Sequence, residues 1–239
     1  MTKVFDFLSA KSPGKRMELL EKFLQFWHGR RRNEYGEPEK SLASLDLPKP
    51  LERFYQFAGR WPKREPRYAS DWIYCEGGYH HLLDVDQLRW TDDGYLEFYQ
   101  EYQGDWTMLT KPGAANPPVW IRGVWDGCPD SLCDLEDPRT KIEFKLADYL
   151  VSHVLLVSLM QSPADDFGTN VFNDYFEEHR DEFAKIWEMP ELNLPLVAGE
   201  IYQCGEVIAL RKYGQTSFHT NTYHGHHALF RILAERIDG

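Results

Sequence analysis

Residues 47–62 have the sequence LPKPLERFYQFAGRWP, which predicts one helix together with its start and its end. Proline fits the first turn of a helix because its missing amide hydrogen is not required there, so Pro50 marks the start. Gly59 predicts the end, since glycine readily adopts the left-handed conformation that often follows a last turn. Between them, four apolar residues recur at helical spacing and form one face: Leu51, Phe54, Tyr55 and Ala58.

A longer amphipathic helix is predicted upstream, over residues 15–32, with Ser12 and Pro13 as start signals. The arginines at its end, Arg30 to Arg32, are expected to complement the negative end of the helix dipole. The alternative is that they form a basic binding patch. The apolar face of this helix consists of Met17, Leu20, Phe23, Leu24 and Trp27.

The two predicted helices are joined by residues 33–46, a polar stretch that predicts a linker or surface loop. Residues 60–143 are rich in Tyr, Trp, Gly, Pro and Asp, which is typical of strands and turns. Residues 103–105 are Gln-Gly-Asp and favour a tight hairpin, so the sheet is predicted to be antiparallel. The β-prone runs lie at residues 71–75, 95–102, 106–110 and 119–124.

The second half of the chain predicts further helices and strands. Residues 144–160 are apolar almost all round and predict a core helix, and residues 171–186 predict a half-exposed helix. Strands are expected over residues 200–213 and 216–223, followed by a closing helix over residues 227–237.

The predicted fold class is α+β, with a central, twisted antiparallel sheet flanked by helices. The chain has 239 residues, of which 42% are hydrophobic, so it can bury a sizeable core. We expect a single domain over residues 1–239, in which residues 1–40 form an N-terminal helical extension.

The sequence also predicts where the protein resides. The longest apolar stretch, Tyr149 to Met160, is shorter than the roughly 20 residues that a membrane span requires. The first residues lack the features of a secretion signal. The cysteines have no paired spacing, which favours free thiols in a reducing cytoplasm: Cys75, Cys128, Cys133 and Cys204.

Charge is distributed unevenly along the chain. Residues 1–64 hold 14 Lys and Arg against 8 Asp and Glu, whereas the remaining residues hold 13 against 30. Nucleic-acid affinity depends largely on Lys and Arg that neutralise phosphates, so the acidic body argues against direct nucleic-acid binding. A basic protein partner is the better expectation.

Histidines near the C-terminus are the densest candidate for a metal site: His219, His224, His226 and His227. The group contains no acidic or cysteine ligand, and neighbours on a strand point to opposite faces. Hydrogen-bonded or exposed histidines are therefore the preferred interpretation. His80 and His81 predict a loop, and Cys128 and Cys133 are too far apart in the sequence for a zinc knuckle.

Glu97, Glu101 and Asp105 are the candidate acid/base carboxylates. If the strand prediction holds, Glu97 and Glu101 share one face about 13 Å apart, which exceeds the separation that glycosidases use. A solvated strand face or a hairpin cap is preferred. Because no nucleophile elbow, phosphate-binding loop, dinucleotide fingerprint or HExxH motif is present, we assign no catalytic residue and expect no cofactor.

The remaining features are acidic and aromatic. Acidic residues occur over Asp126–Asp137 and along the predicted helix at residues 171–186. Such charges usually serve solubility. Combined with aromatic side chains, they can also attract and anchor a basic protein. The candidate partner-binding residues are Glu177, Glu178, Asp181, Glu182, Glu101 and Trp106.

Leu47-Pro48, Leu51, Phe54-Tyr55 and Gly59 resemble the "LP..L..FY...G" signature of the SUKH superfamily, the Smi/Knr-type group. In that group a strand, a glycine-containing turn and a "PV" strand follow the signature. Residues 96–99, 103–106 and 118–120 are similar to those parts and occur in the same order. The similarity covers approximately residues 40–150, so the arginine-bearing helix lies outside it.

The resemblance implies an α+β domain that binds proteins and has no established catalytic residues. Bacterial members of the group act as immunity proteins that neutralise toxins, often nucleases or deaminases of nucleic acids, and fungal members act as regulators. We therefore expect a non-catalytic immunity protein that occludes a basic toxin. The alternatives are an intracellular regulatory scaffold without a toxin partner, and a metal-dependent enzyme that uses His219, His224 and His226.

Overall fold

A computed structural model of the protein describes residues 5–61, 75–76, 80–101, 105–123, 139–160, 169–189, 199–212 and 214–220. Residues 71–74, the hairpin residues 103 and 104, and the predicted closing helix lie outside these ranges. The α-helices are α1 (Pro13–His28), α2 (Glu39–Leu42), α3 (Lys49–Ala58), α5 (Leu146–Met160) and α6 (Thr169–Glu178). Short 3-10 helices are η1 (Asn33–Tyr35), η3 (Val85–Gln87) and η4 (Arg180–Glu182).

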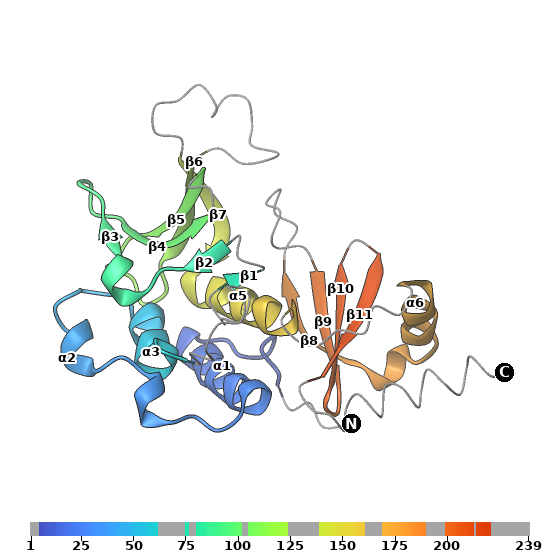
Figure 1. Ribbon diagram of the computed structural model, residues 1–239. Coiled ribbons are helices and arrows are strands. Elements are labelled where there is room, and N and C mark those ends of the chain that lie inside the picture. Colours follow the sequence, from blue (N-terminus) through green and yellow to red (C-terminus); the bar gives the residue numbers. More distant parts are fainter. Residues whose placement is uncertain are drawn as a thin grey trace.

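The strands form two antiparallel sheets (Figure 1). In the described part the first sheet has the order β1-β2-β4-β5-β6-β7, with β3 paired to β4, and the second has the order β11-β10-β9-β8. The predicted α+β class is confirmed, although the strands divide between two sheets instead of one central set. The first sheet contains β1 (Cys75–Glu76), β2 (His80–Leu82), β3 (Arg89–Trp90), β4 (Leu96–Glu101), β5 (Trp106–Thr110), β6 (Pro118–Gly123) and β7 (Arg139–Lys145). The second contains β8 (Ala184–Met189), β9 (Gly199–Cys204), β10 (Val207–Lys212) and β11 (Gln215–His219).

Helix α1 begins where the sequence predicts and ends earlier. Ser12 Oγ accepts a hydrogen bond from the Lys15 amide (3.2 Å), which satisfies one of the unpaired donors of the first turn. The helix ends at His28 instead of Arg32 because Gly29 adopts a positive φ of 93°. The buried residues are those predicted: Met17, Leu20, Phe23, Leu24 and Trp27.

Arg30, Arg31 and Arg32 lie beyond the end of α1 at His28, so the predicted extent of the helix to residue 32 is wrong. Arg31 serves α3 instead. Its Nε donates to the carbonyl of Phe57 (3.0 Å) and its Nη2 to that of Gln56 (3.1 Å), at the negative end of that helix.

Helix α3 buries its predicted face, but Gly59 ends it for a different reason. Gly59 has φ −57° and ψ −13°, so the expected left-handed conformation is wrong. A Cβ at Gly59 would lie 2.6 Å from the carbonyl oxygen of Tyr55, so close backbone approach excludes larger residues. The Glu37 amide also donates to that oxygen (2.8 Å). The predicted linker at residues 33–46 therefore packs on α3 and contains η1 and α2.

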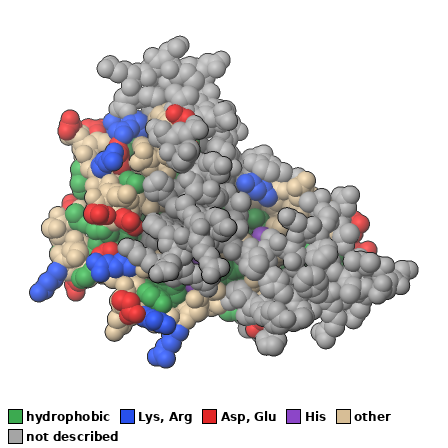
Figure 2. All heavy atoms as spheres, viewed as in Figure 1, with side chains coloured by type: hydrophobic (Ala, Val, Ile, Leu, Met, Phe, Trp, Pro, Cys, Tyr) green, Lys and Arg blue, Asp and Glu red, His purple; other side chains and the backbone are tan. Residues whose placement is uncertain are grey.

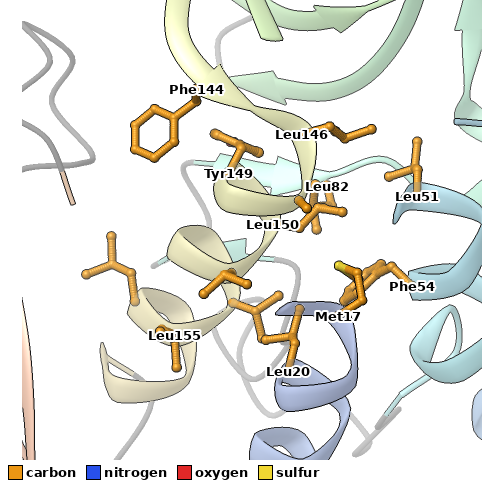
Figure 3. Close-up of a cluster of buried hydrophobic side chains, with 14 of the residues drawn as sticks. Met17, Leu20, Leu51, Phe54, Leu82, Phe144, Leu146, Tyr149, Leu150 and Leu155 are labelled. Atoms are coloured by element: carbon orange, nitrogen blue, oxygen red, sulfur yellow. The ribbon is translucent and has the colours of Figure 1, made fainter. Parts of the chain in front are cut away.

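Helix α5 contacts both sheets and α1, which explains why its sequence is apolar all round (Figure 1). Its polar groups find partners: Trp187 Nε1 of β8 donates to Ser152 Oγ (2.8 Å), and Trp27 Nε1 donates to the Ser158 carbonyl (3.0 Å). The helix begins after Phe144, which belongs to β7, a strand that was not predicted. Figure 3 shows side chains from three helices gathered in one cluster: Met17, Leu20, Leu51, Phe54, Leu146 and Leu150.

A β-bulge in β4 decides which side chains face α5. Glu97 pairs with Leu109 and Tyr99 pairs with Met108, so Phe98 is an extra residue. The side chains of β4 that follow the bulge consequently point to the opposite face of the sheet from the one they would occupy in a strand without a bulge. Tyr99 lies against Tyr149 of α5, with ring centroids 5.9 Å apart.

The second sheet has α5 on one side and α6 on the other (Figure 1). The predicted helix over residues 171–186 was too long: α6 ends at Glu178, and Ile186 lies in β8. The predicted strand over residues 200–213 is a hairpin of β9 and β10 that turns at Gly205, where φ is 59°. No helix in the described ranges has both the length and the apolar character needed to cross a membrane.

Candidate protein-binding surface

An aromatic cluster fixes α6 on the second sheet. Phe176 is fully buried and lies 5.0 Å from the Tyr202 ring and 5.4 Å from the Phe183 ring, measured between centroids. Aromatic rings packed edge to face give both a large buried area and a defined geometry. The cluster contains Phe172, Tyr175, Phe176, Phe183, Tyr202 and Phe218, with Ala209 of β10.

The outer side of α6 and the following η4 form an acidic surface. Four of its carboxylates are candidate residues from the sequence, and the structure leaves all four exposed on α6 and η4. Asp181 and Glu182 have no ion pair among the described residues. The acidic surface consists of Asp174, Glu177, Glu178, Asp181 and Glu182.

Arg180, the cation in η4, points away from the acidic surface and onto the aromatic cluster. The Arg180 guanidinium carbon lies 4.1 Å from the Tyr202 ring centroid and 5.3 Å from that of Phe176. Its Nη2 donates to Tyr202 Oη (2.9 Å). Arg211 of β10 pairs with Glu177 (2.7 Å), whose side chain is 55% exposed and so keeps much of its contact with solvent. The carboxylates outnumber the cations that face them.

A hydrogen-bonded network continues from the acidic surface across the second sheet. Tyr202 Oη donates to Glu200 Oε2 (2.7 Å), and Lys185 Nζ lies 2.5 Å from Glu200 and 2.9 Å from Glu188. Burial by itself would raise the pKa of Glu200, but the hydrogen bonds from Lys185 and Tyr202 lower it below its usual value. Burial, together with the charge of Glu200, raises the pKa of Tyr202. Both groups keep their ordinary neutral-pH ionisation, and the network is structural.

Cys204 is a half-buried thiol at the end of β9. Burial, followed by the negative charge of Glu182, raises its pKa above the usual value. A thiol is nucleophilic as the thiolate, so this environment disfavours a catalytic role for Cys204.

The other two candidate partner-binding residues, Glu101 and Trp106, do not belong to an exposed surface. Their exposed fractions are 9% and 4%. Trp106 stacks on Tyr99 with ring centroids 5.5 Å apart, and Glu101 Oε2 accepts a hydrogen bond from the Asp105 amide (3.4 Å). The bulge at Phe98 turns Glu101 to the same side as Tyr99, and the sequence pattern contains no signal for that bulge.

The same bulge separates the candidate acid/base carboxylates. Glu97 shares a face with Leu109, whereas Glu101 lies on the opposite face. The prediction of a shared, solvated face is therefore wrong. Glu97 is 7% exposed and forms an ion pair with Arg122. The hydrogen bond from the Asp105 amide to Glu101 matches the alternative of a hairpin cap.

His219 is buried and its ring is held by Ser217, whose Oγ lies 2.8 Å from His219 Nε2. Burial lowers the pKa of His219 to about 4, so the imidazole is neutral at physiological pH. Among the described residues, no group of three or more His, Cys, Asp or Glu could hold a metal ion. His80 and His81 lie in β2, not in a loop. Outside the described residues lie His224, His226, His227, Cys128, Cys133 and the acidic residues from Asp126 to Asp137.

Comparison with known proteins supplies no family for this chain. A scan against models of protein families finds no match, and searches of curated proteins and of solved structures find none either.

Proposed function

We propose that this protein is a non-catalytic binding domain that holds a basic protein through the acidic surface of α6 and η4. The observation that carries this proposal is the arrangement of exposed carboxylates on a packed aromatic cluster, with Arg180 turned inward. Rigid charges of one sign raise the rate at which an oppositely charged protein is captured.

The aromatic cluster holds the acidic surface in a fixed arrangement before a partner binds. Phe176 and Phe183 are buried beneath α6 and η4, so the backbone that carries the carboxylates is held by packing before a partner arrives. A surface that is already ordered loses less conformational entropy on binding. The carboxylates act as a preformed recognition surface for Lys and Arg.

The resemblance to SUKH proteins supports a more specific version of the proposal, in which the partner is a toxin domain and this protein is its immunity protein. Toxins that act on nucleic acids carry basic active sites because they must approach phosphates. An acidic surface is suited to cover such a site. In this version, binding occludes the catalytic groups of the toxin, and the protein itself performs no reaction.

Capture from an extract of the native cell tests the proposal. The unaltered protein and a variant with Glu177→Lys, Glu178→Lys and Glu182→Lys serve as parallel baits. A basic protein that is retained by the first bait and lost from the second supports the proposal. A control bait reverses three exposed acidic residues elsewhere, Glu34, Glu39 and Asp86.

The genes on either side of this one separate a toxin partner from a regulatory one. A neighbouring nuclease or deaminase gene predicts a toxin, whose activity is measured with and without equimolar protein. Full activity in the presence of this protein would contradict the immunity function. Retention of the same proteins by the unaltered and charge-reversed baits would contradict the acidic surface as the binding site.

A further inference from the structure

The first sheet has a face that points away from the main helices. Figure 1 shows α1, α3 and α5 on one side of this sheet. The strand pairing places a row of residues on the opposite face: Arg89 pairs with Glu97, Glu97 with Leu109, Leu109 with Trp120, and Trp120 with Lys141. Arg122 pairs with Arg139 next to this row.

Cations predominate on this face. Three of its acidic groups are Asp92, Asp93 and Glu97, and the last two are already neutralised. Glu97 pairs with Arg122, and Asp93 Oδ2 lies 2.5 Å from Arg139 Nη1. We call the following residues the basic face: Arg89, Lys111, Arg122, Arg139 and Lys141.

Two of these cations are available to a partner. Arg89 and Lys141 are exposed and have no ion pair among the described residues. On the face seen in Figure 2, Lys and Arg side chains and Asp and Glu side chains both occur over the described part of the molecule. The unpaired positive charge on the basic face is suited to attract an anionic partner.

A hollow of about 670 Å³ lies on this face, and its lining contains the carboxylates of Asp92, Asp93 and Glu97 as well as arginines. Its lining includes Trp90, which is 42% exposed and is the exposed large hydrophobic residue of the described part of the chain. Arg89, Asp93, Arg122 and Arg139 also line it. A tryptophan beside arginines is the composition found at the energetic centres of protein interfaces.

Aromatic rings hold the cations in place. Lys111 Nζ and the Arg139 guanidinium carbon each lie 5.0 Å from the Tyr95 ring centroid. Tyr95 packs edge to face on Trp120, with centroids 5.8 Å apart. A cation above an aromatic ring is ordered without being neutralised by it, so Lys111 remains able to attract a carboxylate, whereas Arg139 is already paired with Asp93. This part of the face is pre-organised.

We propose that the basic face binds an acidic protein segment, whose carboxylates meet Arg89 and Lys141 and whose apolar side chain enters the hollow beside Trp90. This site is separate from the acidic surface and selects a partner of opposite charge. The evidence for this site comes from the first sheet alone. If the acidic surface on α6 and η4 binds no partner, the proposal for the basic face is unaffected.

A synthetic peptide tests this site directly. The probe is a fluorescein-labelled peptide of aspartates and glutamates around one central phenylalanine, and binding is measured by fluorescence anisotropy. The affinity is expected to fall at least about tenfold for Trp90→Ala and for Arg89→Glu, as for residues at the centre of an interface. Lys40→Glu reverses an exposed cation in α2 and should bind like the unaltered protein.

Three results would overturn the proposal. The first is equal binding by the unaltered protein and by both Trp90→Ala and Arg89→Glu. The second is equal binding of a peptide in which lysines replace the acidic residues. The third is tighter binding of labelled oligothymidylate, which would assign the face to nucleic acid. Arg89→Gln removes the charge without reversing it and should weaken binding less than Arg89→Glu. Circular dichroism confirms that each variant is folded.

Discussion

His219 makes the stability of the protein depend on pH. Burial lowers its pKa from 6.5 to about 4 in the folded chain. Between these values the unfolded chain binds more protons, so the free energy of unfolding falls as pH is lowered from 6.5 towards 4, by about 3 kcal/mol in all. Above pH 6.5 this contribution is complete and constant.

Urea unfolding at pH 7 and pH 5 checks the role of His219. The variant His219→Gln keeps a polar side chain but cannot become charged in this range. It should lose less stability between the two pH values than the unaltered protein. An identical loss in both proteins would show that another group causes the pH dependence.

Gly59 is required because the end of α3 leaves no space for a side chain. The Cβ of a larger residue would lie 2.6 Å from the Tyr55 carbonyl oxygen, a backbone atom that cannot move without breaking the helix end. Gly59→Val is expected to lower the free energy of unfolding by at least about 1 kcal/mol. Gly14→Ala is the matched control, since nothing lies within 4 Å of the added Cβ. Equal melting temperatures for Gly59→Val and the unaltered protein would contradict this explanation.

At the scale of an element, α3 depends on Arg31 from a separate segment. The guanidinium donates to two carbonyls of the last turn and lies 5.0 Å from the Phe57 ring centroid. Arg31→Gln should lower the free energy of unfolding by about 1 kcal/mol, the size expected for a cation at a helix end. Arg30→Gln, at an exposed position, should have no effect on chemical denaturation. Equal losses in the two variants would exclude a specific role for Arg31.

The elements that the sequence predicted are those with a sustained apolar period. Helices α1 and α3 have such a period, with Pro13 and Pro50 in their first turns, and α5 was predicted from a run that is apolar almost all round. The apolar spacing predicted wrong helix boundaries where it continued from a helix into a neighbouring strand. Ile186 continues the spacing of α6, although η4 interrupts the helix and places Ile186 in β8. Phe144 continues that of α5 but lies in β7.

The part of the candidate site that lies in one stretch of sequence was predicted. The parts that depend on how strands pair in a sheet were missed. Glu177, Glu178, Asp181 and Glu182 lie within one short stretch, and all four are exposed on α6 and η4. The burial of Glu101 depends on the bulge in β4, which pairing with β5 determines. The inward position of Arg180 likewise depends on Tyr202, a residue of another element.

At the scale of the whole molecule, one core joins the two sheets. Residues of β8, β9 and β10 belong to the same buried cluster as α1, α3 and α5. The acidic surface on α6 is supported by its own aromatic cluster, which contains Tyr202 and Phe218. Charge changes on the exposed side of α6 should therefore alter binding while the main core stays intact.

The rate of association with the basic partner recovered by capture tests whether the acidic surface is the site of binding. Glu177→Lys, Glu178→Lys and Glu182→Lys together are expected to slow association at least about tenfold at low ionic strength, with a smaller difference when salt screens the charges. The control variant with Glu34→Lys, Glu39→Lys and Asp86→Lys should associate faster than this variant. An association rate that is unchanged by the α6 and η4 substitutions and insensitive to salt would contradict the acidic surface as the site of capture.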